Sequence, residues 1–449
     1  MRAIRKALPV IVCAVLTLLA SDALAYKLHT LHAFCGYASC PDGVGPIGGL
    51  VIDTAGNLYG TAIGGGGDGK GIVFELIANA AKTKWKYRVI HRFCQLPGCE
   101  DGATPYASMI VDAQGNLYGT TIAGGPGNGG TVFELMPNTG HAKWKLAVRY
   151  AFCATSGCPD GIAPEASLSY LGKASGAPYD GVSPLYGTTS GEGTGTTGNV
   201  FMLKPGGRHW KEQVLYDFCS LPNCADGGAP FAGVTVDQAG NLYGTTFSGG
   251  TNRAWGVVYE LSPGAGGFGA GAPVETVLYS FCTVVDECTD GGFPMSDLVL
   301  AANGDIYGTT FGGGNPDSAN CVAQGRSGCG VIFKIIPNGT ASQEIVLYRF
   351  CSLEDCVDGG HPRTGLVMDP VGSLYGVTRS GGRNGPLGDG TIFKYDTKEQ
   401  VLYRFCYKTD CADGYEPTGQ PIMDGSGNLF GTAFTGGPGN GGTVFELIH

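Results

Sequence analysis

One short motif recurs seven times along this chain, and it constrains the fold more than any other feature. It reads Gly-Asn-Leu-Tyr-Gly-Thr-Thr at residues 115–121, and variants of it occur throughout the sequence. Its aromatic position is held by Tyr59, Tyr118, Tyr186, Tyr243, Tyr307, Tyr375 and Phe430. Successive copies lie 55 to 68 residues apart, which is longer than the period of a solenoid repeat (about 20–45 residues) and long enough for a unit of several strands.

Each unit contains four short runs with β-strand character. In the second unit these runs cover residues 108–111, 116–121, 131–135 and 144–152. Val, Ile, Phe, Tyr and Thr dominate the runs, whereas Gly, Asn, Asp and Pro separate them. No stretch after residue 25 keeps a helical period, so we expect almost no helix. Four antiparallel strands repeated seven times predict an all-β fold, a seven-bladed β-propeller of four-stranded blades.

The two ends of the repeat array are complementary. Residues 27–34 resemble the fourth run of a unit, and residues 442–447 resemble the third. The first three runs therefore occur seven times in order, but the fourth run occurs only six times between them, and its seventh copy stands at the start of the chain. We predict that the N-terminal strand completes the last blade and closes a single propeller domain over residues 26–449.

The first 25 residues have the features of a signal peptide. Arg2, Arg5 and Lys6 precede an apolar stretch over residues 8–19, and residues 23–25 form an Ala-Leu-Ala cleavage site. That apolar stretch is too short to span a bilayer. Cleavage near Ala25 predicts a secreted or periplasmic protein without membrane insertion. It would remove three basic residues and Asp22, which changes the formal net charge from −10 to −12 and argues against nucleic acid and anionic lipid as partners.

Sixteen of the seventeen cysteines lie after the predicted signal peptide, and they fall into eight close pairs. The pairs are Cys35/Cys40, Cys94/Cys99, Cys153/Cys158, Cys219/Cys224, Cys282/Cys288, Cys321/Cys329, Cys351/Cys356 and Cys406/Cys411. An even number of cysteines in an exported chain indicates disulfides. Zinc binding is the alternative, but the spacing is mostly C-x4-C and no histidines match it. We therefore predict eight disulfides between adjacent cysteines, held by loops rather than strands, and no metal site.

The combined motifs resemble those of the GloVer tandem-repeat family of bacterial exported proteins. The resemblance rests on D-x-x-G-N-L-Y-G-T-T, G-T-V-F-E-L, V-L-Y-x-F and D-G-x-x-P, and it covers nearly all of the chain after residue 25. It implies a propeller-like exported protein with no established activity. Two features depart from the family pattern: the paired cysteines beside D-G, and the end of the chain at His449, where many relatives carry a surface-sorting anchor.

Two kinds of loop are expected on the same face of the propeller. In an up-and-down meander, the cysteine loop between the fourth and first strands and the glycine-rich loop between the second and third strands emerge together. Each cysteine loop carries an aspartate before a glycine, and these are Asp42, Asp101, Asp160, Asp226, Asp290, Asp358 and Asp413. They could form a carboxylate ring for calcium or a cationic ligand, but we favour a turn in which the following glycine has positive φ. We likewise expect the repeated tyrosines to pack in the core.

Nucleotide, hydrolase and metalloprotease motifs are missing from the sequence. The glycine-rich loops lead into strands rather than helices and contain no G-K-[ST], so we expect no nucleotide and no cofactor. No G-x-S-x-G or H-E-x-x-H motif occurs.

The fifth unit carries an extra insertion over residues 315–330. We expect this insertion on the same face as the cysteine loops and the glycine-rich loops.

The positions that differ between units are the best candidates for ligand binding. Directly after the D-G-x-x-P proline, at the expected mouth of the central channel, lie Ile47, Tyr106, Glu165, Phe231, Met295, Arg363 and Thr418, with His361 and Glu416 just before it. From these we select Tyr106, Glu165, Phe231, Met295, His361, Arg363 and Glu416 as candidate ligand-binding residues. We expect a monomeric, non-enzymatic binding or scaffold module for a glycan or another extracellular ligand such as a protein. The alternative is a polysaccharide hydrolase or lyase that uses a carboxylate pair at the same face.

Overall fold

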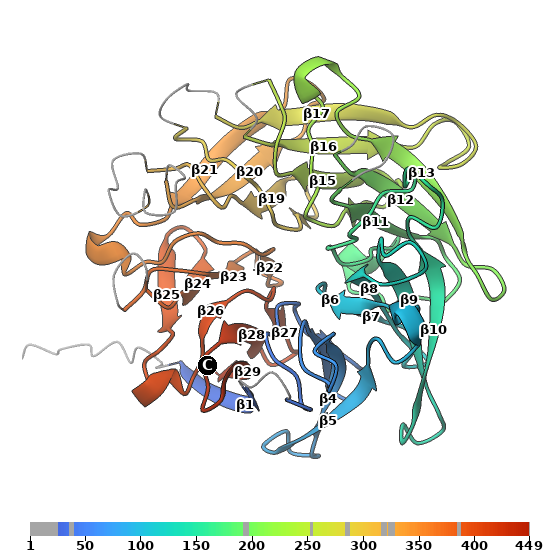
Figure 1. Ribbon diagram of the computed structural model, residues 1–449. Helices are drawn as coiled ribbons and strands as arrows, with labels where there is room; N and C mark the ends of the chain where they lie inside the picture. Colours follow the sequence, from blue (N-terminus) through green and yellow to red (C-terminus); the bar gives the residue numbers. More distant parts are fainter. Residues whose placement is uncertain are drawn as a thin grey trace, which may run out of the picture.

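The protein forms a ring of small antiparallel sheets arranged around a central axis (Figure 1). The computed structural model describes residues 26–35, 40–191, 197–251, 255–282, 288–315, 321, 328–383 and 388–448. The predicted signal peptide, residues 1–25, lies outside the described residues. Within the described part of the chain, the only helical segments are short 3-10 turns, and no helix is both long and apolar enough to cross a membrane.

Seven sheets follow one another around the ring, as predicted. The strands are β1 (Lys27–Cys35), β2 (Val51–Ile52), β3 (Leu58–Ala62), β4 (Ile72–Ala78), β5 (Trp85–Arg92), β6 (Ala103–Pro105), β7 (Ile110–Val111), β8 (Leu117–Ala123), β9 (Thr131–Pro137), β10 (Trp144–Ala151), β11 (Leu185–Thr189), β12 (Asn199–Lys204), β13 (Lys211–Asp217), β14 (Thr235–Val236), β15 (Leu242–Thr246), β16 (Val257–Ser262), β17 (Val274–Ser280), β18 (Val299–Leu300), β19 (Ile306–Thr309), β20 (Val331–Ile336), β21 (Gln343–Arg349), β22 (Val367–Met368), β23 (Leu374–Thr378), β24 (Thr391–Tyr395), β25 (Glu399–Arg404), β26 (Tyr415–Pro417), β27 (Ile422–Met423), β28 (Leu429–Thr435) and β29 (Asn440–Ile448). We number the blades in chain order: blade 1 is β2–β5, blade 2 is β6–β10, blade 3 is β11–β13, blade 4 is β14–β17, blade 5 is β18–β21, blade 6 is β22–β25, and blade 7 is β26–β29 with β1.

The innermost strand of each blade is shorter than its sequence suggests. In blade 2 the expected run over residues 108–111 reduces to β7, and a separate strand, β6, pairs with the far end of β8. The proline after D-G-x-x lacks an N–H, and the residue before it is left-handed, so the chain leaves the sheet between these two pieces. In blade 3 a single bridge between Ser169 and Tyr186 replaces the inner strand, because residues 170–182 leave the blade.

The N-terminal strand closes the ring, as predicted. β1 pairs antiparallel with β29, placing Leu28 opposite Leu447 and Thr30 opposite Phe445. Blades 7 and 1 are also joined through the inner wall, since the Thr432 hydroxyl donates a hydrogen bond to the Gly48 carbonyl at 3.1 Å. Equivalent threonine bonds of 2.8 to 3.4 Å link most of the other neighbouring blades, so the ring-closing junction uses the same contacts as the rest.

The core consists of one aromatic contact repeated at every junction between blades. A phenylalanine at the end of the outermost strand of one blade packs against an aromatic ring on the third strand of the next, with centroids 4.9 to 5.3 Å apart. The pairs are Phe34–Phe74, Phe93–Phe133, Phe152–Phe201, Phe218–Tyr259, Phe281–Phe333, Phe350–Phe393 and Phe405–Phe445. All of these side chains are fully buried. The glycine of Y-G-T is required here, because a Cβ at Gly119 would lie 2.6 Å from the Phe133 ring.

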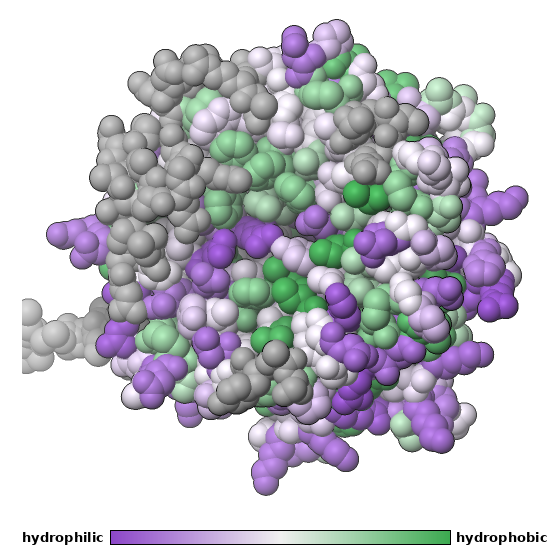
Figure 2. All heavy atoms as spheres, viewed as in Figure 1, coloured by the Kyte–Doolittle hydropathy of each residue, from purple (hydrophilic) through white to green (hydrophobic). Residues whose placement is uncertain are grey.

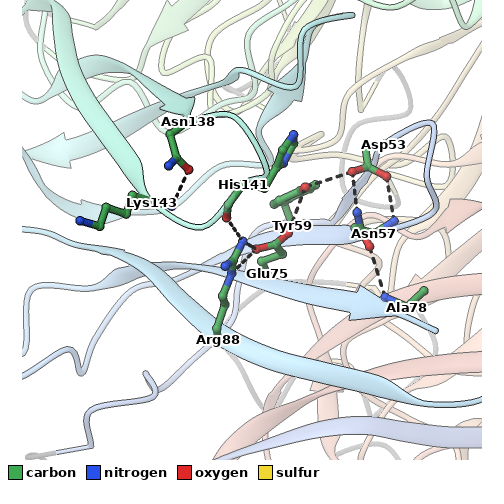
Figure 3. A network of polar contacts seen from close by, with 9 residues as sticks. All are labelled: Asp53, Asn57, Tyr59, Glu75, Ala78, Arg88, Asn138, His141 and Lys143. Carbon is green, nitrogen blue, oxygen red and sulfur yellow. Dashed lines mark hydrogen bonds and ion pairs between the residues drawn. The ribbon is translucent and has the colours of Figure 1, made fainter.

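The D-x-x-G-N-L-Y part of the repeat fixes the turn before the second strand. In blade 1 the Asp53 carboxylate accepts hydrogen bonds from the Asn57 backbone at 2.8 Å and from the Tyr59 hydroxyl at 3.0 Å (Figure 3). Tyr59 itself is 1 % exposed. Blade 2 repeats the arrangement with Asp112 and Tyr118. Tyr59 and Tyr118 are therefore core residues whose hydroxyls hold the turn. Tyr243 is also buried, whereas Tyr186, Tyr307 and Tyr375 are only partly buried.

Candidate functional site

The cysteine loops and the glycine-rich loops lie on the same face of the propeller, which we call the decorated face. In six blades a glycine N–H from the glycine-rich loop donates to the carbonyl of the second cysteine at 2.8 to 3.0 Å. The donors are Gly66, Gly125, Gly250, Gly314, Gly382 and Gly437. Side chains have no room where the two loops meet, because a Cβ at Gly249 would lie 2.5 Å from the Cα of Gly227. Glycine enrichment thus reflects close packing of two loops.

All eight predicted disulfides are confirmed, and each joins neighbouring cysteines whose Cα atoms lie 4.0 to 5.7 Å apart. The Cys321–Cys329 bond belongs to the insertion of blade 5 and packs beside Cys351 and Cys356. Residues 316–320 and 322–327 of that insertion lie outside the described residues. The sulfurs that cluster here, and those grouped with Asp42 or Asp389, all belong to disulfide-bonded cysteines, which disfavours metal ligation. The bonds are Cys35–Cys40, Cys94–Cys99, Cys153–Cys158, Cys219–Cys224, Cys282–Cys288, Cys321–Cys329, Cys351–Cys356 and Cys406–Cys411.

The expectation that loops alone hold the cysteines needs a correction. Cys35 is the last residue of β1, and Cys99 and Cys224 end the 3-10 turns Pro97–Cys99 and Pro222–Cys224. Cys356 and Cys411 also end 3-10 turns. The cause is the short link between paired cysteines, because the chain must turn back within a few residues to bring the two sulfurs together.

The second cysteine of several pairs also adopts a left-handed backbone conformation, which the sequence did not predict. Its φ is 54° at Cys99, 43° at Cys158, 52° at Cys224 and 41° at Cys288, although non-glycine residues rarely adopt positive φ. None of these four cysteines lines the mouth of the channel. They are structural residues that shape the decorated face, and they do not belong to the candidate ligand site.

The repeated aspartates brace the cysteine loops. The Asp226 carboxylate accepts hydrogen bonds from the Ser220 and Leu221 backbones at 2.8 and 3.2 Å and from the Tyr216 hydroxyl at 2.9 Å. Asp358 and Asp413 repeat this pattern. In two junctions a histidine, His32 or His91, stands in place of the tyrosine, 3.5 and 3.7 Å from its aspartate. The glycines after the aspartates have φ of 81° to 101°, so these positions form turns, with the carboxylates reaching back across the disulfide loop.

The mouth of the channel on this face is a cavity of about 90 Å³, which we call the mouth cavity. Every blade contributes one of the residues that follow the D-G-x-x-P proline, namely Ile47, Tyr106, Glu165, Phe231, Met295, Arg363 and Thr418. The volume suffices for several waters or one small substituent. Figure 2 shows apolar side chains gathered beside the hollow of this face, over the region of β15 to β19, with hydrophilic side chains next to them.

Arg363 and Tyr106 meet across the mouth although they are 257 residues apart in sequence. The Arg363 guanidinium donates a hydrogen bond to the Tyr106 hydroxyl, and its carbon lies 5.7 Å from the centre of the tyrosine ring. Burial raises the pKa of Tyr106, and Arg363 opposes that shift. Burial also raises the pKa of Glu165, although the Ser190 hydroxyl donates to its carboxylate at 2.9 Å and Arg363 favours its ionised form. The cavity thus holds the Arg363 cation together with the Glu165 carboxyl group, whose pKa burial raises.

Two of the predicted residues do not line the mouth cavity. His361 is 3 % exposed, and its Nδ1 lies 2.7 Å from the Ser380 hydroxyl. Glu416 forms an ion pair of 3.4 Å with Arg379. Each also meets the residue that follows the G-T-T motif of the preceding blade: the His361 ring lies 4.9 Å from that of Phe311, and Glu416 pairs with Arg379. We call these contacts, made by the left-handed residue before each proline, the second ring.

Three aromatic side chains beside Phe231, namely Phe247, Phe293 and Trp255, were missed by the sequence-based prediction, whereas Phe231 itself was one of the predicted residues and lines the mouth cavity. Phe247 lies 5.2 Å from Phe231 and 5.1 Å from Phe293, whose ring is 4.5 Å from Trp255. All four side chains are partly exposed. We call them the aromatic rim. Comparison of the units would have found them, because Phe293 stands where other blades carry Ala163 or Ala229, and Phe247 stands where blade 3 carries Ser190.

A family model describing the Gloeobacter/Verrucomicrobia repeat matches residues 17–183 and 173–445. The chain belongs to this repeat family. The residues that recur in this member build the blades, whereas the residues directly after the D-G-x-x-P proline, which line the mouth cavity, differ in every blade. No protein of curated function matches the sequence.

Three solved structures are similar to this member of the repeat family at low sequence identity. A proposed 6-phosphogluconolactonase of Bacteroides uniformis has 12 % identity and a TM-score of 0.45, over 78 % of this chain and 82 % of its own. PorZ, a surface component of the type-IX secretion system of Porphyromonas gingivalis, has 13 % identity and a TM-score of 0.40, over 85 % of this chain and 44 % of its own. A proposed oxidoreductase (glucose dehydrogenase) of Thermus thermophilus has 14 % identity and a TM-score of 0.37, over 77 % of this chain and 96 % of its own. We draw no functional argument from these likenesses.

Proposed function

We propose that this protein is an exported binding module whose decorated face holds a glycan that carries an acidic substituent. One observation carries the proposal. The residues that recur from blade to blade have structural tasks, whereas the side chains that converge on the mouth cavity differ in every blade. Variable side chains presented by a rigid repeated scaffold are the usual composition of a binding surface.

The two sectors of the mouth suggest what the ligand looks like. The mouth cavity of about 90 Å³ is large enough for a small anionic group such as a carboxylate. Within the described residues, Tyr106 is the hydrogen-bond partner of the Arg363 guanidinium, which leaves further N–H groups for a planar bidentate contact with an anion. The aromatic rim lies beside the cavity and offers apolar faces of the kind on which sugar rings stack. We infer that the acidic group enters the cavity while the sugar body rests on the rim.

Export is part of the same proposal. Residues 1–25 have the signature of a signal peptide, and eight disulfides form where the environment is oxidising. These features favour the periplasm or the cell exterior, where glycans are abundant.

A glycan array followed by titration calorimetry on the best ligand tests the proposal. Arg363→Gln should weaken binding of an acidic glycan by about 10- to 100-fold, since hydrogen bonds to charged groups are worth about 1.5–3 kcal/mol. Arg383→Gln is the matched control, because Arg383 also stacks on a tyrosine, Tyr407 at 5.0 Å, but does not line the cavity. Equal effects of the two substitutions, or an array without acidic hits, would contradict the proposal.

A second candidate function, polysaccharide hydrolysis, is favoured by the carboxyl groups of the cavity. Glu165 has a raised pKa, and Asp297 lines the same cavity with its carboxylate accepting the Gly233 N–H at 2.7 Å. Two carboxyl groups in different environments are the basis of acid–base catalysis in glycosidases. Turnover of a polysaccharide that Glu165→Gln abolishes would replace the binding proposal with this one.

A further inference from the structure

The central channel has a second, much larger cavity at its other end. This cavity, which we call the channel pocket, has a volume of about 1010 Å³. It is bounded by the turns between the first and second strands of blades 1 and 2, on the face opposite the decorated one. Ser108, Ser167 and Gln420 line both cavities and separate them.

Most of the channel pocket is apolar. Its wall includes the side chains of three inner strands, Val51 and Ile52 of β2, Ile110 and Val111 of β7, and Ile422 and Met423 of β27. Cavities of several hundred Å³ with this kind of lining and a few polar groups are typical of sites for small organic molecules.

The acidic groups of the channel pocket are already engaged by the protein. Glu75 forms an ion pair with Arg88 of 2.5 Å, and Arg88 also donates to the His141 carbonyl (Figure 3). Asp53 and Asp112 accept hydrogen bonds from their own turns and from the strand tyrosines. Through the His141 carbonyl, Arg88 links blade 1 to the turn before β10 of blade 2.

A segment found in one blade alone places a cation in this apolar surrounding. Residues 170–182 leave blade 3 and carry a 3-10 turn at Lys173–Ser175. The segment is anchored by Tyr179, which is fully buried and donates to the Ser183 carbonyl at 2.6 Å, and by Tyr170, which donates to the Ala177 carbonyl at 2.7 Å. A β-bridge between Tyr179 and Asp112 ties the segment to blade 2, and Lys173 lines the channel pocket.

The ammonium group of Lys173 is poorly compensated there. Within the described residues its hydrogen-bond partner is the Leu168 carbonyl at 3.0 Å, although an ammonium group has three N–H donors. Burial lowers the pKa of Lys173, and the charge of Asp297 opposes the shift. Because Lys173 takes part in no ion pair among the described residues, an incoming anion would supply the missing counter-charge, favour the ammonium form and accept hydrogen bonds from its remaining N–H groups.

We propose that the channel pocket is a second ligand site, which binds an apolar molecule carrying one anionic group such as a carboxylate or sulfonate, with Lys173 as its counter-charge. The apolar inner strands hold the body of the molecule, and the segment over residues 170–182 positions the cation. This site lies on the opposite face from the mouth cavity, and its cation and apolar wall are not shared with that cavity.

Two fluorescent probes with the same apolar body test the proposal. 8-Anilinonaphthalene-1-sulfonate carries an anionic group, and N-phenyl-1-naphthylamine lacks it. Lys173→Met should weaken binding of the sulfonate probe at least tenfold and change binding of the neutral probe less than twofold. Lys173→Arg keeps the charge and should restore most of the sulfonate affinity.

Two further variants locate the probes. Met423→Trp adds bulk to the apolar wall of the channel pocket and should weaken both probes, whereas Arg363→Gln at the mouth cavity should change neither. Melting temperatures verify that each variant is folded, and if Lys173→Met does not fold, the comparison of Lys173→Gln with Lys173→Arg replaces it. The proposal fails if the wild type binds neither probe, if loss of the Lys173 charge leaves sulfonate affinity unchanged, or if Arg363→Gln weakens the sulfonate probe instead.

Discussion

Truncation of Phe34 tests whether the N-terminal strand is an integral part of the ring. Phe34 is 0 % exposed and lies 5.3 Å from Phe74 of blade 1 and 5.8 Å from Tyr87. Removing a fully buried phenylalanine side chain costs about 3–5 kcal/mol, from lost transfer free energy and from the cavity left behind. A loss of about 4 kcal/mol corresponds to a change of about a thousandfold in the folding equilibrium.

The matched control is Phe218→Ala within the continuous part of the ring. Phe218 is also 0 % exposed and packs 4.9 Å from Tyr259. If β1 is as integral as any other outermost strand, both variants should lose similar free energies of unfolding in urea, followed by tryptophan fluorescence. If Phe34→Ala loses less than about 1 kcal/mol while Phe218→Ala loses several, the N-terminal strand is a loosely attached edge and does not close the ring in the way described.

Three further predictions concern the residues shared by the blades. Burial and nearby aspartates raise the pKa of four glutamates on outermost strands, to about 8 for Glu212 and Glu344 and to about 7 for Glu275 and Glu399. Above about pH 4 the folded state therefore binds more protons than the unfolded state, so the free energy of unfolding should fall as pH rises to about 8. Replacing all four glutamates by Gln should flatten the dependence of the melting temperature on pH over that range, and an unchanged slope would contradict the raised pKa values. Asp226→Ala removes the acceptor of three hydrogen bonds and should lower the free energy of unfolding by about 3 kcal/mol or more. EDTA should leave the melting temperature of the wild type unchanged, and a lower melting temperature with EDTA would favour the calcium interpretation of the aspartates. Thr432→Val should lower the free energy of unfolding by about 1–2 kcal/mol, since it leaves the Gly48 carbonyl without its donor, and Thr120→Val, at the junction of blades 2 and 3, should cost the same.

The ring was predictable because its contacts repeat. The same tyrosine, glycine and phenylalanine positions recur from unit to unit, and the phase of the two ends alone indicates that β1 pairs with β29. The cysteine pairing was equally accessible, since close spacing leaves neighbours as the natural partners. The ring closure and the cysteine pairing both follow from the spacing of residues along the chain and do not require knowledge of side-chain conformations.

The features that escaped prediction depend on single departures from the repeat or on local backbone conformation. Nothing in the sequence indicates that Arg363 reaches Tyr106 across the mouth, because that contact is decided by side-chain conformation between blades far apart in the chain. His361 and Glu416 were assigned to the same site, but a left-handed backbone turns them into the second ring. The segment over residues 170–182 has no counterpart in the other units, so no repeat could show where Lys173 would lie.

Hydrogen–deuterium exchange with and without the best acidic glycan is the measurement that tests the proposed function most directly. If the mouth is the binding site, exchange should slow in the segments that line the mouth cavity, around residues 103–108, 163–167 and 361–365, together with the aromatic rim near Phe293. Segments on the opposite face, including residues 53–57 and 112–116, should exchange as before. Protection confined to that opposite face, or no protection under saturating glycan, would contradict the claim that the variable residues of the mouth form the binding site.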